Sequence, residues 1–256
     1  MASTRSDQER PSTLLDIISV LDREGPMGVT ELAATLDIAK STAHYHLSTL
    51  RQNGFVTKDG TQYGLGLSFL KMGLQTRRRE PLFDAAKEEI DKLADETGEL
   101  AILSIEQRGL GVYLYKQGGS DALDIDAPIG GSATLHNRAL GKAMLSRYDE
   151  ERVDEIIDRH GLPETAERTI TSRAELKQAL RNVREEGVAF NREESIDGIH
   201  GVGVPITSAE GAVLGAISVA GPAKRLNGSL FTEELPDILS RARNVIELNH
   251  QHGHSY

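Results

Sequence analysis

One face of a helix predicted over residues 41–53 is small, polar and able to donate and accept hydrogen bonds. Its members are Ser41, Thr42, Tyr45, Ser48, Thr49 and Gln52. Side chains of this kind bond the phosphates and base edges that line a DNA major groove. The opposite stripe is apolar, with Ala43, Leu47 and Leu50 at spacings of four and three, and should face another helix. The pattern therefore favours nucleic-acid recognition over a purely structural helix pair.

The segments around this helix have the pattern of a winged helix-turn-helix. Upstream, Thr30 can cap a short helix, and a corner at residues 37–39 leads into the second helix, which Ser41 opens. Downstream, the pair Asp59-Gly60 favours a tight hairpin turn. We therefore expect residues 55–66 to form a wing beside the second helix.

A glycine-rich loop later in the chain is a second candidate site. Gly130, Gly131 and Ser132 precede a predicted helix, and His136 stands near its start. Backbone N–H groups exposed by such a loop suit a carboxylate. The alternative for the glycines is turn geometry alone, and His136 could bond a ligand or cap its own helix.

The remaining pattern predicts an α+β protein. We expect a flexible arm over 1–11, a winged helix-turn-helix domain over 12–66, a linker helix over 67–80, and a second domain over 81–256. In that domain, helices are expected at 81–97, around 139–145, at 150–160, from a capping box at Ser172 to Glu186, and from about Thr232. Strands are expected at 100–106, 112–116, 123–127, 188–193, 201–206 and 212–220. Strands gathered at both ends of the domain indicate a mainly antiparallel sheet flanked by helices.

The composition excludes several kinds of protein. The 256 residues include no cysteine, which rules out disulfides, a thiol nucleophile and thiolate metal ligands. No apolar run approaches the ~20 residues of a membrane span, and residues 1–13 lack the apolar core of a secretory signal. We therefore expect a cytoplasmic protein with no membrane partner.

The net charge of −10 is unevenly distributed. Residues 1–80 hold ten Lys and Arg against nine Asp and Glu, whereas residues 81–256 hold 19 against 30. The field around the N-terminal region is therefore weak, and contact with DNA should depend on local cations such as Lys40, Arg51 and Lys58.

Over nearly its whole length the chain resembles the IclR family of transcriptional regulators. The resemblance is carried, in order, by GVTELAATLDIAKSTAHYHLSTLRQNGFV, a wing ending in YGLG, LHNRALGKAMLS, GVAFNREESIDGIHGVGVPI and GAISVAGPAKRL. It implies a C-terminal GAF-like effector-binding domain. It also implies a homodimer or dimer of dimers that binds double-stranded promoter DNA at a pseudo-palindromic site. The implied effector is a small molecule, commonly a carboxylic acid.

The resemblance also implies site residues. The recognition helix is Ser41–Asn53, and the candidates for DNA contact are Lys40, Ser41, Thr42, His44, Tyr45 and Thr49, with Arg51 and Lys58 added by their charge. The expected effector residues are Gly130, Gly131, Ser132, His136, Asn191, Ile199, Gly201, Ser218 and Ala220. Gly201 and Ala220 stand where relatives can carry bonding side chains, so we expect a ligand bulkier than a two- or three-carbon keto acid.

Two other classes of function were weighed against this one. An enzyme would need more than Ser218 and His136, since the chain lacks a Gly-x-Ser-x-Gly elbow and an evident third partner; we expect no enzyme activity and no cofactor. The alternating His250, His252 and His254 lie in a tail that we expect to be disordered. They should bind metal only adventitiously, because such a tail lacks the second shell that fixes ligands. A stand-alone metabolite-binding module, in which the helix-turn-helix serves only dimerisation, remains the alternative function.

Overall fold

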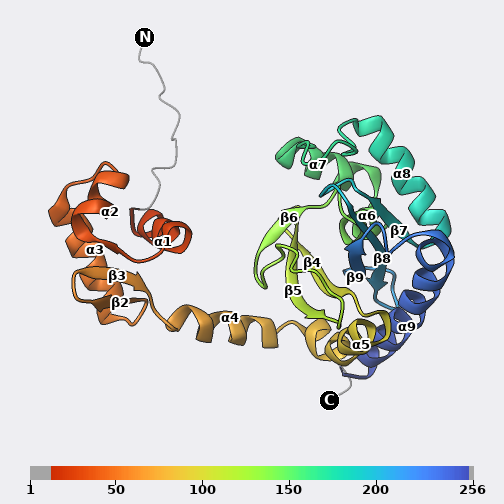
Figure 1. Cartoon of the computed structure of the whole chain (residues 1–256), viewed down its shortest axis with the longest axis horizontal. Coiled ribbons are helices and arrows are strands. Elements are labelled where there is room, and N and C mark those ends of the chain that lie inside the picture. Colours follow the sequence, from red (N-terminus) through yellow and green to blue (C-terminus); the bar gives the residue numbers. More distant parts are fainter. Residues whose placement is uncertain (1–12, 254–256) are drawn as a thin grey trace, which may run out of the picture. The chain divides into compact units, whose positions relative to one another are not determined.

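The structure is a computed structural model, and it describes residues 13–253. The arm expected over 1–11 and the last tail histidine, His254, lie outside the described residues. The chain divides into two compact units (Figure 1). The N-terminal unit runs to Thr76 and the C-terminal unit begins at Arg77. Each unit has its own hydrophobic interior.

The N-terminal unit is a winged helix-turn-helix. Its elements are α1 (Thr13–Glu24), β1 (Met27–Gly28), α2 (Val29–Thr35), α3 (Lys40–Gln52), β2 (Val56–Asp59) and β3 (Gln62–Leu65). Ile17, Leu32 and Leu47 meet from the three helices and are fully buried. The strands form an antiparallel sheet in the order β1-β3-β2, with Gly60 at the hairpin turn in a left-handed conformation (φ 56°).

Both helices of the motif begin earlier than the sequence predicts: the cap of α2 is two residues before Thr30, and α3 begins at Lys40, one residue before Ser41. Gly28 and Ala39, not Thr30 and Ser41, are the N-caps, and neither makes a side-chain cap hydrogen bond. Both caps have extended backbone, with ψ of 156° and 139°, so the helical turn starts at the next residue. Strand β1 was not predicted, because its two residues are too few to display an alternating pattern.

Helix α4 (Ser68–Arg78) follows the wing and contains no buried residue. The ring of Phe69 contacts that of Phe55, with centroids 5.1 Å apart. Four large apolar side chains in and beside α4 are exposed in the single chain: Leu67, Leu70, Met72 and Leu74. This helix therefore presents apolar surface that the chain itself does not cover.

A six-stranded antiparallel sheet forms the centre of the C-terminal unit, which confirms the predicted α+β class. The strands are β4 (Leu100–Gln107), β5 (Leu110–Gly118), β6 (Ser132–Thr134), β7 (Ala189–Arg192), β8 (Ile199–Thr207) and β9 (Val213–Pro222), in the spatial order β6-β5-β4-β9-β8-β7. The long strands carry runs of buried apolar side chains on both faces, and each face is covered by helices.

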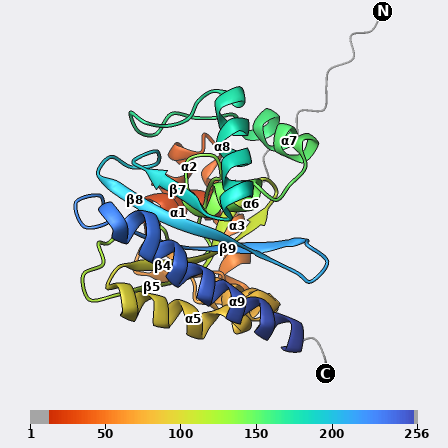
Figure 2. The same cartoon turned by 90° about the vertical axis from the view of Figure 1, so that its right-hand side faces the viewer.

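Helices α5 (Pro81–Thr97) and α9 (Leu235–Gly253) lie side by side across one face of the sheet (Figure 2). A short π-helical turn, η1 (Leu230–Glu234), leads into α9. On the other face lie α6 (Ala139–Leu145), α7 (Glu150–His160) and α8 (Arg173–Glu186). The predicted ends of α8 are confirmed, since the Ser172 hydroxyl accepts from the Glu175 N–H at the N-cap and Gly187 ends the helix at φ 76°. Of the two bonds of the predicted capping box, the structure shows this one.

Two expectations for this unit are wrong. Residues 123–127 form no strand; Ile125 and Ala127 are buried, but no neighbouring strand pairs with them, and the edge of the sheet is β6 instead. The tail is helical as far as Gly253 because Ile246 is buried and anchors the end of α9, so His250 and His252 lie on a helix. No helix within residues 13–253 is long and apolar enough to cross a membrane.

Candidate nucleic-acid interface and ligand cavity

Helix α3 presents its polar face to solvent because its apolar stripe is buried. Ala43, Leu47 and Leu50 are at most 4% exposed and pack in the interior of the N-terminal unit. Tyr45, on the opposite face, is 68% exposed. An exposed tyrosine ring can be covered by a partner surface, which is favourable because the ring is apolar. Its hydroxyl is available for a hydrogen bond.

The other predicted DNA-contacting residues lie around Tyr45. Lys40, Ser41, His44 and Arg51 are exposed on α3, and Thr42 and Thr49 are half-buried. The Thr49 hydroxyl donates to the carbonyl of Tyr45 at 3.1 Å, so only its acceptor capacity remains for another group. The helix thus places hydroxyl, imidazole and cationic groups on one accessible surface.

The wing, which follows α3 in the sequence, contributes one further cation, Lys58. Lys58 lies on β2 directly opposite Tyr63 of β3, and its ammonium is 5.2 Å from the centre of that ring. The ring holds the stem of the lysine while the charge stays in water, because Lys58 is exposed. Its role in DNA contact stays a prediction.

The C-terminal unit contains a small cavity beside the centre of its sheet. It encloses about 30 Å³ and is lined by Ile102, Tyr113, Ile125, Ala127, Arg138, Ala139, Leu140, Asn191, Ser195, Ile196, Ile199, Gly201, Ser218 and Ala220. This space holds about two water molecules. The wall is mostly aliphatic, with a few polar side chains, as is typical of a small-molecule site.

The structure brings five of the predicted effector residues together in this wall: Asn191, Ile199, Gly201, Ser218 and Ala220. Strand register is the reason. Asn191 of β7 lies opposite Gly201 of β8, which lies opposite Ala220 of β9, so one row across three strands faces the cavity. Their part in effector binding stays a prediction, but their proximity is a fact of the fold.

The other four predicted effector residues do not line this cavity. The N–H groups of Gly130 and Gly131 donate to the carbonyls of Tyr113 and Pro128, both at 2.8 Å, so they are not exposed as the glycine-rich loop suggested. Ser132 is exposed on β6. The loop closes a turn onto the edge of the sheet, which is the alternative that the glycines left open.

His136 also lies elsewhere than expected. Its Nε2 bonds the carbonyl of Pro163 at 3.2 Å, it is 3% exposed, and the N-cap of α6 is Arg138. It therefore caps no turn of its own helix. Burial lowers its pKa below the ordinary value, because an imidazolium would lose its hydration, and the charges of Lys142 and Arg138 lower it further.

The extra room expected from Gly201 amounts to about one methyl group. A Cβ placed there would meet the Val219 carbonyl oxygen at 3.5 Å and the Asn191 Cβ at 3.6 Å. These are ordinary contact distances, so a methyl group would fit beside these atoms, but a larger side chain would have to displace them. The prediction of a bulky ligand thus finds no support in the shape of this cavity.

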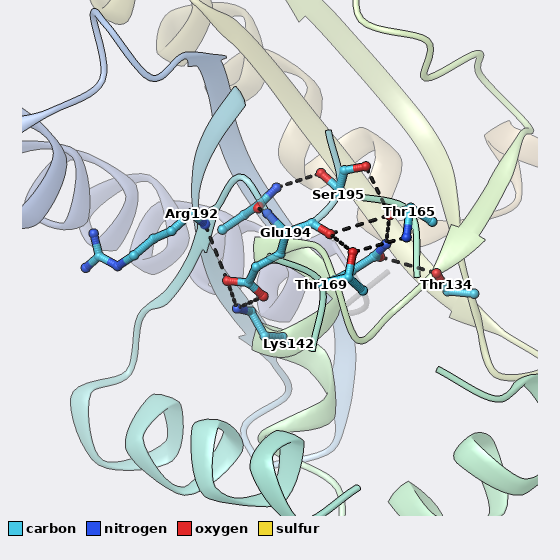
Figure 3. Close-up of polar contacts among 9 residues, drawn as sticks. Thr134, Lys142, Thr165, Thr169, Arg192, Glu194 and Ser195 are labelled. Carbon is cyan, nitrogen blue, oxygen red and sulfur yellow. Dashed lines mark hydrogen bonds and ion pairs between the residues drawn. The ribbon is translucent and has the colours of Figure 1, made fainter. Parts of the chain in front are cut away.

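A buried polar network holds the cavity wall in place (Figure 3). Asn191 donates to the Ser195 hydroxyl at 2.8 Å and accepts from the Glu194 N–H at 2.8 Å. The hydroxyls of Thr165 and Thr169 donate to backbone carbonyls of the same turn, at Ser195 and Glu194. The turn after β7 therefore has one defined position. The two polar cavity residues here, Asn191 and Ser195, are already hydrogen-bonded to each other.

Lys142 and Glu194 form an ion pair within this network and are 4% and 7% exposed. Burial lowers the pKa of Lys142, and the adjacent carboxylate opposes that shift. This ion pair was not predicted from the sequence. The available signal was a lysine inside an otherwise apolar helix, Ala139–Leu145, where an unpaired charge would be too costly to keep.

Tyr113, Arg138 and Ser195 were also missed as cavity residues. Burial raises the pKa of Tyr113, so its hydroxyl keeps its proton at neutral pH. Nothing in the local sequence indicates that the middle of β5 meets the start of α6. No group of three His, Cys, Asp or Glu side chains suited to a metal ion occurs among the residues that the structure describes.

The fold and these two sites define a class of protein: a helix-turn-helix regulator with a separate ligand-binding domain. Family models match both parts, the "IclR helix-turn-helix domain" over residues 14–60 and the "Bacterial transcriptional regulator IclR C-terminal" over residues 75–247. The chain belongs to the IclR family of transcriptional regulators, which combine a helix-turn-helix DNA-binding domain with an effector-binding C-terminal domain.

Individual relatives agree over the full length. The chain is 33% identical over 254 residues to the Halobacterium salinarum protein named "Probable HTH-type transcriptional regulator ArcR", covering 96% of this chain and 97% of that one. The Thermotoga maritima IclR crystal structure is 27% identical, with a TM-score of 0.80 over 93% of this chain and 96% of that one. An IclR homologue from Microbacterium hydrocarbonoxydans, crystallised with 4-hydroxybenzoate, has the same fold, with 20% identity and a TM-score of 0.80 over 94% and 100% of the two chains.

Proposed function

We propose that this chain binds double-stranded promoter DNA as a homodimer or dimer of dimers and that a small carboxylic acid in the C-terminal cavity changes its affinity for that DNA. The observation that carries the proposal is the polar, Tyr45-centred surface of α3, kept in solvent by the burial of the opposite stripe. Acting on promoters places the protein in the cytoplasm. It is a regulator rather than an enzyme.

For DNA contact we propose Lys40, Ser41, Thr42, His44, Tyr45, Thr49 and Arg51 on α3, with Lys58 on the wing. Tyrosine cannot make the bidentate bond by which arginine reads guanine. Tyr45 instead supplies a ring for a thymine methyl group or a hydroxyl for a phosphate. We therefore expect the base preference at this position to depend on apolar contact more than on paired hydrogen bonds.

The exposed apolar residues of α4 support a dimer. Leu67, just before α4, is 79% exposed, and Leu70 and Met72 on α4 are 58% and 52% exposed. Large apolar side chains grouped in this way are rarely left in contact with water. A second copy of the chain, packed through its own α4, is the occupant we propose. Two copies would present two recognition helices to a two-fold symmetric site, as dimeric helix-turn-helix proteins do.

In the ligand domain we propose that Asn191, Ile199, Gly201, Ser218 and Ala220 contact the effector. Support comes from the row that Asn191, Gly201 and Ala220 form across β7, β8 and β9, and from the aliphatic cavity wall that all five residues share. The effector acts by population shift: it must bind one DNA-binding arrangement of the dimer better than another.

Selection of bound sequences from a random duplex library, at several salt concentrations, tests the DNA proposal. We expect a two-fold symmetric motif whose half-sites are separated by about one helical turn or a multiple of it. Folded protein that enriches no motif would refute the proposal and leave a metabolite-binding module whose helix-turn-helix serves only dimerisation. Sedimentation of the free protein tests the dimer, and a monomer would refute that part.

A further inference from the structure

Two polar side-chain atoms in the cavity wall are buried without a hydrogen-bond partner in the described part of the chain. They are the hydroxyl of Tyr113, a residue only 3% exposed, and Nε of Arg138. Both residues line the same cavity. Buried polar atoms are nearly always bonded, so two orphans facing one space indicate a partner that the chain itself does not contain.

Both groups can donate a hydrogen bond. An arginine guanidinium has five N–H donors and no acceptor, and it is always charged. Burial raises the pKa of Tyr113, so its hydroxyl keeps its proton, and the nearby charge of Arg138 only partly opposes this effect. The partner of the Arg138 Nε must therefore be an acceptor, and an acceptor also suits the Tyr113 hydroxyl.

The other polar side chains of the cavity wall supply no negative charge. Asn191 and Ser195 are bonded to each other, whereas the Ser218 hydroxyl makes no hydrogen bond within residues 13–253. The lining includes no Asp or Glu. Asp126, whose charge reaches Tyr113, is exposed and forms no ion pair with Arg138 in the described structure. Within the described residues, no carboxylate therefore pairs with the Arg138 guanidinium at the cavity wall.

Apart from these groups, the wall is aliphatic. Ile102, Ile125 and Ile199 bound the space, and about 30 Å³ is enclosed. A hydroxyl-rich ligand or a second acid group would meet aliphatic carbon here and lose its hydrogen bonds to water. A single acid group on a compact hydrocarbon body matches both parts of the wall.

We propose that Arg138 and Tyr113 are the groups that recognise the acid of the effector, a compact monocarboxylate whose hydrocarbon body lies against the isoleucine wall. The inference rests on the proposed function, in that it takes this cavity as the effector site. It moves the acid-binding role from the loop at residues 130–132, whose N–H groups are occupied, to side chains of β5 and the start of α6.

The test compares acids with amides of the same shape, using calorimetry on the full chain. Acetate is paired with acetamide, and propionate with propionamide, at pH 7.5, because these compact acids suit the small volume of the cavity. We expect the best acid to bind about tenfold or more tightly than its amide. Equal binding of acid and amide, or no binding of either acid at millimolar concentration, would overturn the proposal.

Two variants test the residues themselves. Arg138→Met removes the guanidinium and its charge but keeps an unbranched stem, and Tyr113→Phe removes only the hydroxyl. We expect Arg138→Met to weaken acid binding about tenfold and to leave amide binding unchanged, with a smaller loss for Tyr113→Phe. Neither should unfold the protein, because each removes an unbonded buried polar atom. The control is Lys224→Met, at an exposed site away from the cavity lining.

DNA binding, measured separately, distinguishes this inference from the proposed function. If acid binds through Arg138 but leaves DNA affinity unchanged, the regulatory proposal fails and the inference stands. If an acid changes the DNA affinity of the original chain and of Arg138→Met to the same extent, the inference fails and the regulatory proposal stands.

Discussion

The ammonium group of Lys142 on α6 meets the carboxylate of Glu194, 52 residues further along the chain, inside the C-terminal unit. The same Glu194 donates its backbone N–H to the side chain of Asn191, which lines the ligand cavity. The ion pair thus ties α6 to the turn after β7 (Figure 3). One wall of the cavity depends on a pair of buried charges.

Removing one charge of this pair should destabilise the protein strongly. We expect Lys142→Met to lower the free energy of unfolding by about 3–5 kcal/mol, because Glu194 would remain buried without a counter-charge. Urea unfolding measures this value. Arg241→Met, which breaks an exposed pair with Glu96, is the control and should cost about 1 kcal/mol or less. The double variant Lys142→Met with Glu194→Leu should lose less free energy of unfolding than Lys142→Met alone, because no unpaired charge stays buried. A larger loss in the double variant would contradict this explanation.

Acid should destabilise the fold through His136. Its folded-state pKa lies below the unfolded value of about 6.5, so the unfolded chain binds more protons between the two values. Stability from this group is present above about pH 6.5 and is lost as pH falls through the lowered folded pKa. Urea midpoints at pH 7.5 and 5.0 should differ less in His136→Gln than in the original chain. His252→Gln, at an exposed site on α9, should leave the difference unchanged.

Truncating Tyr45 should affect DNA binding alone. The side chain is 68% exposed, so Tyr45→Ala should leave the thermal midpoint almost unchanged and weaken specific binding about fivefold or more. Fluorescence anisotropy on the selected motif measures the affinity. Tyr45→Phe separates the two contact modes, because it retains packing on a thymine methyl group and loses a phosphate bond. Equal loss of acid binding in Tyr45→Ala would argue against separate sites.

Neutralising the wing cation should change the salt dependence of DNA binding. If Lys58 contacts one phosphate, Lys58→Ala reduces the slope of log K against log salt by about 1, for specific and non-specific sequences alike. Lys224→Ala, an exposed lysine of the C-terminal unit, serves as the matched control. An unchanged slope for Lys58→Ala would show that this lysine contacts no phosphate and stays in solvent when DNA is bound.

The sequence by itself determined the fold class and most of the longer elements. Ala43, Leu47 and Leu50 repeat at helical spacing, so their burial and the exposure of Tyr45 followed from periodicity alone. The hairpin at Asp59-Gly60 and the N-cap at Ser172 followed from turn and cap chemistry. Each of these signals lies within one turn or one hairpin, where neighbours in the chain are neighbours in space.

Only the tertiary structure decided how the ligand cavity is built. Gly130 and His136 suggested a site by their local pattern, but their hydrogen bonds are satisfied by Tyr113 and Pro163, which belong to other segments. Arg138 and Tyr113 became candidates only when α6 packed against β5. Which donor remains unpaired depends on every group that folding brings near it, and those groups are set by strand register and helix packing across the whole domain.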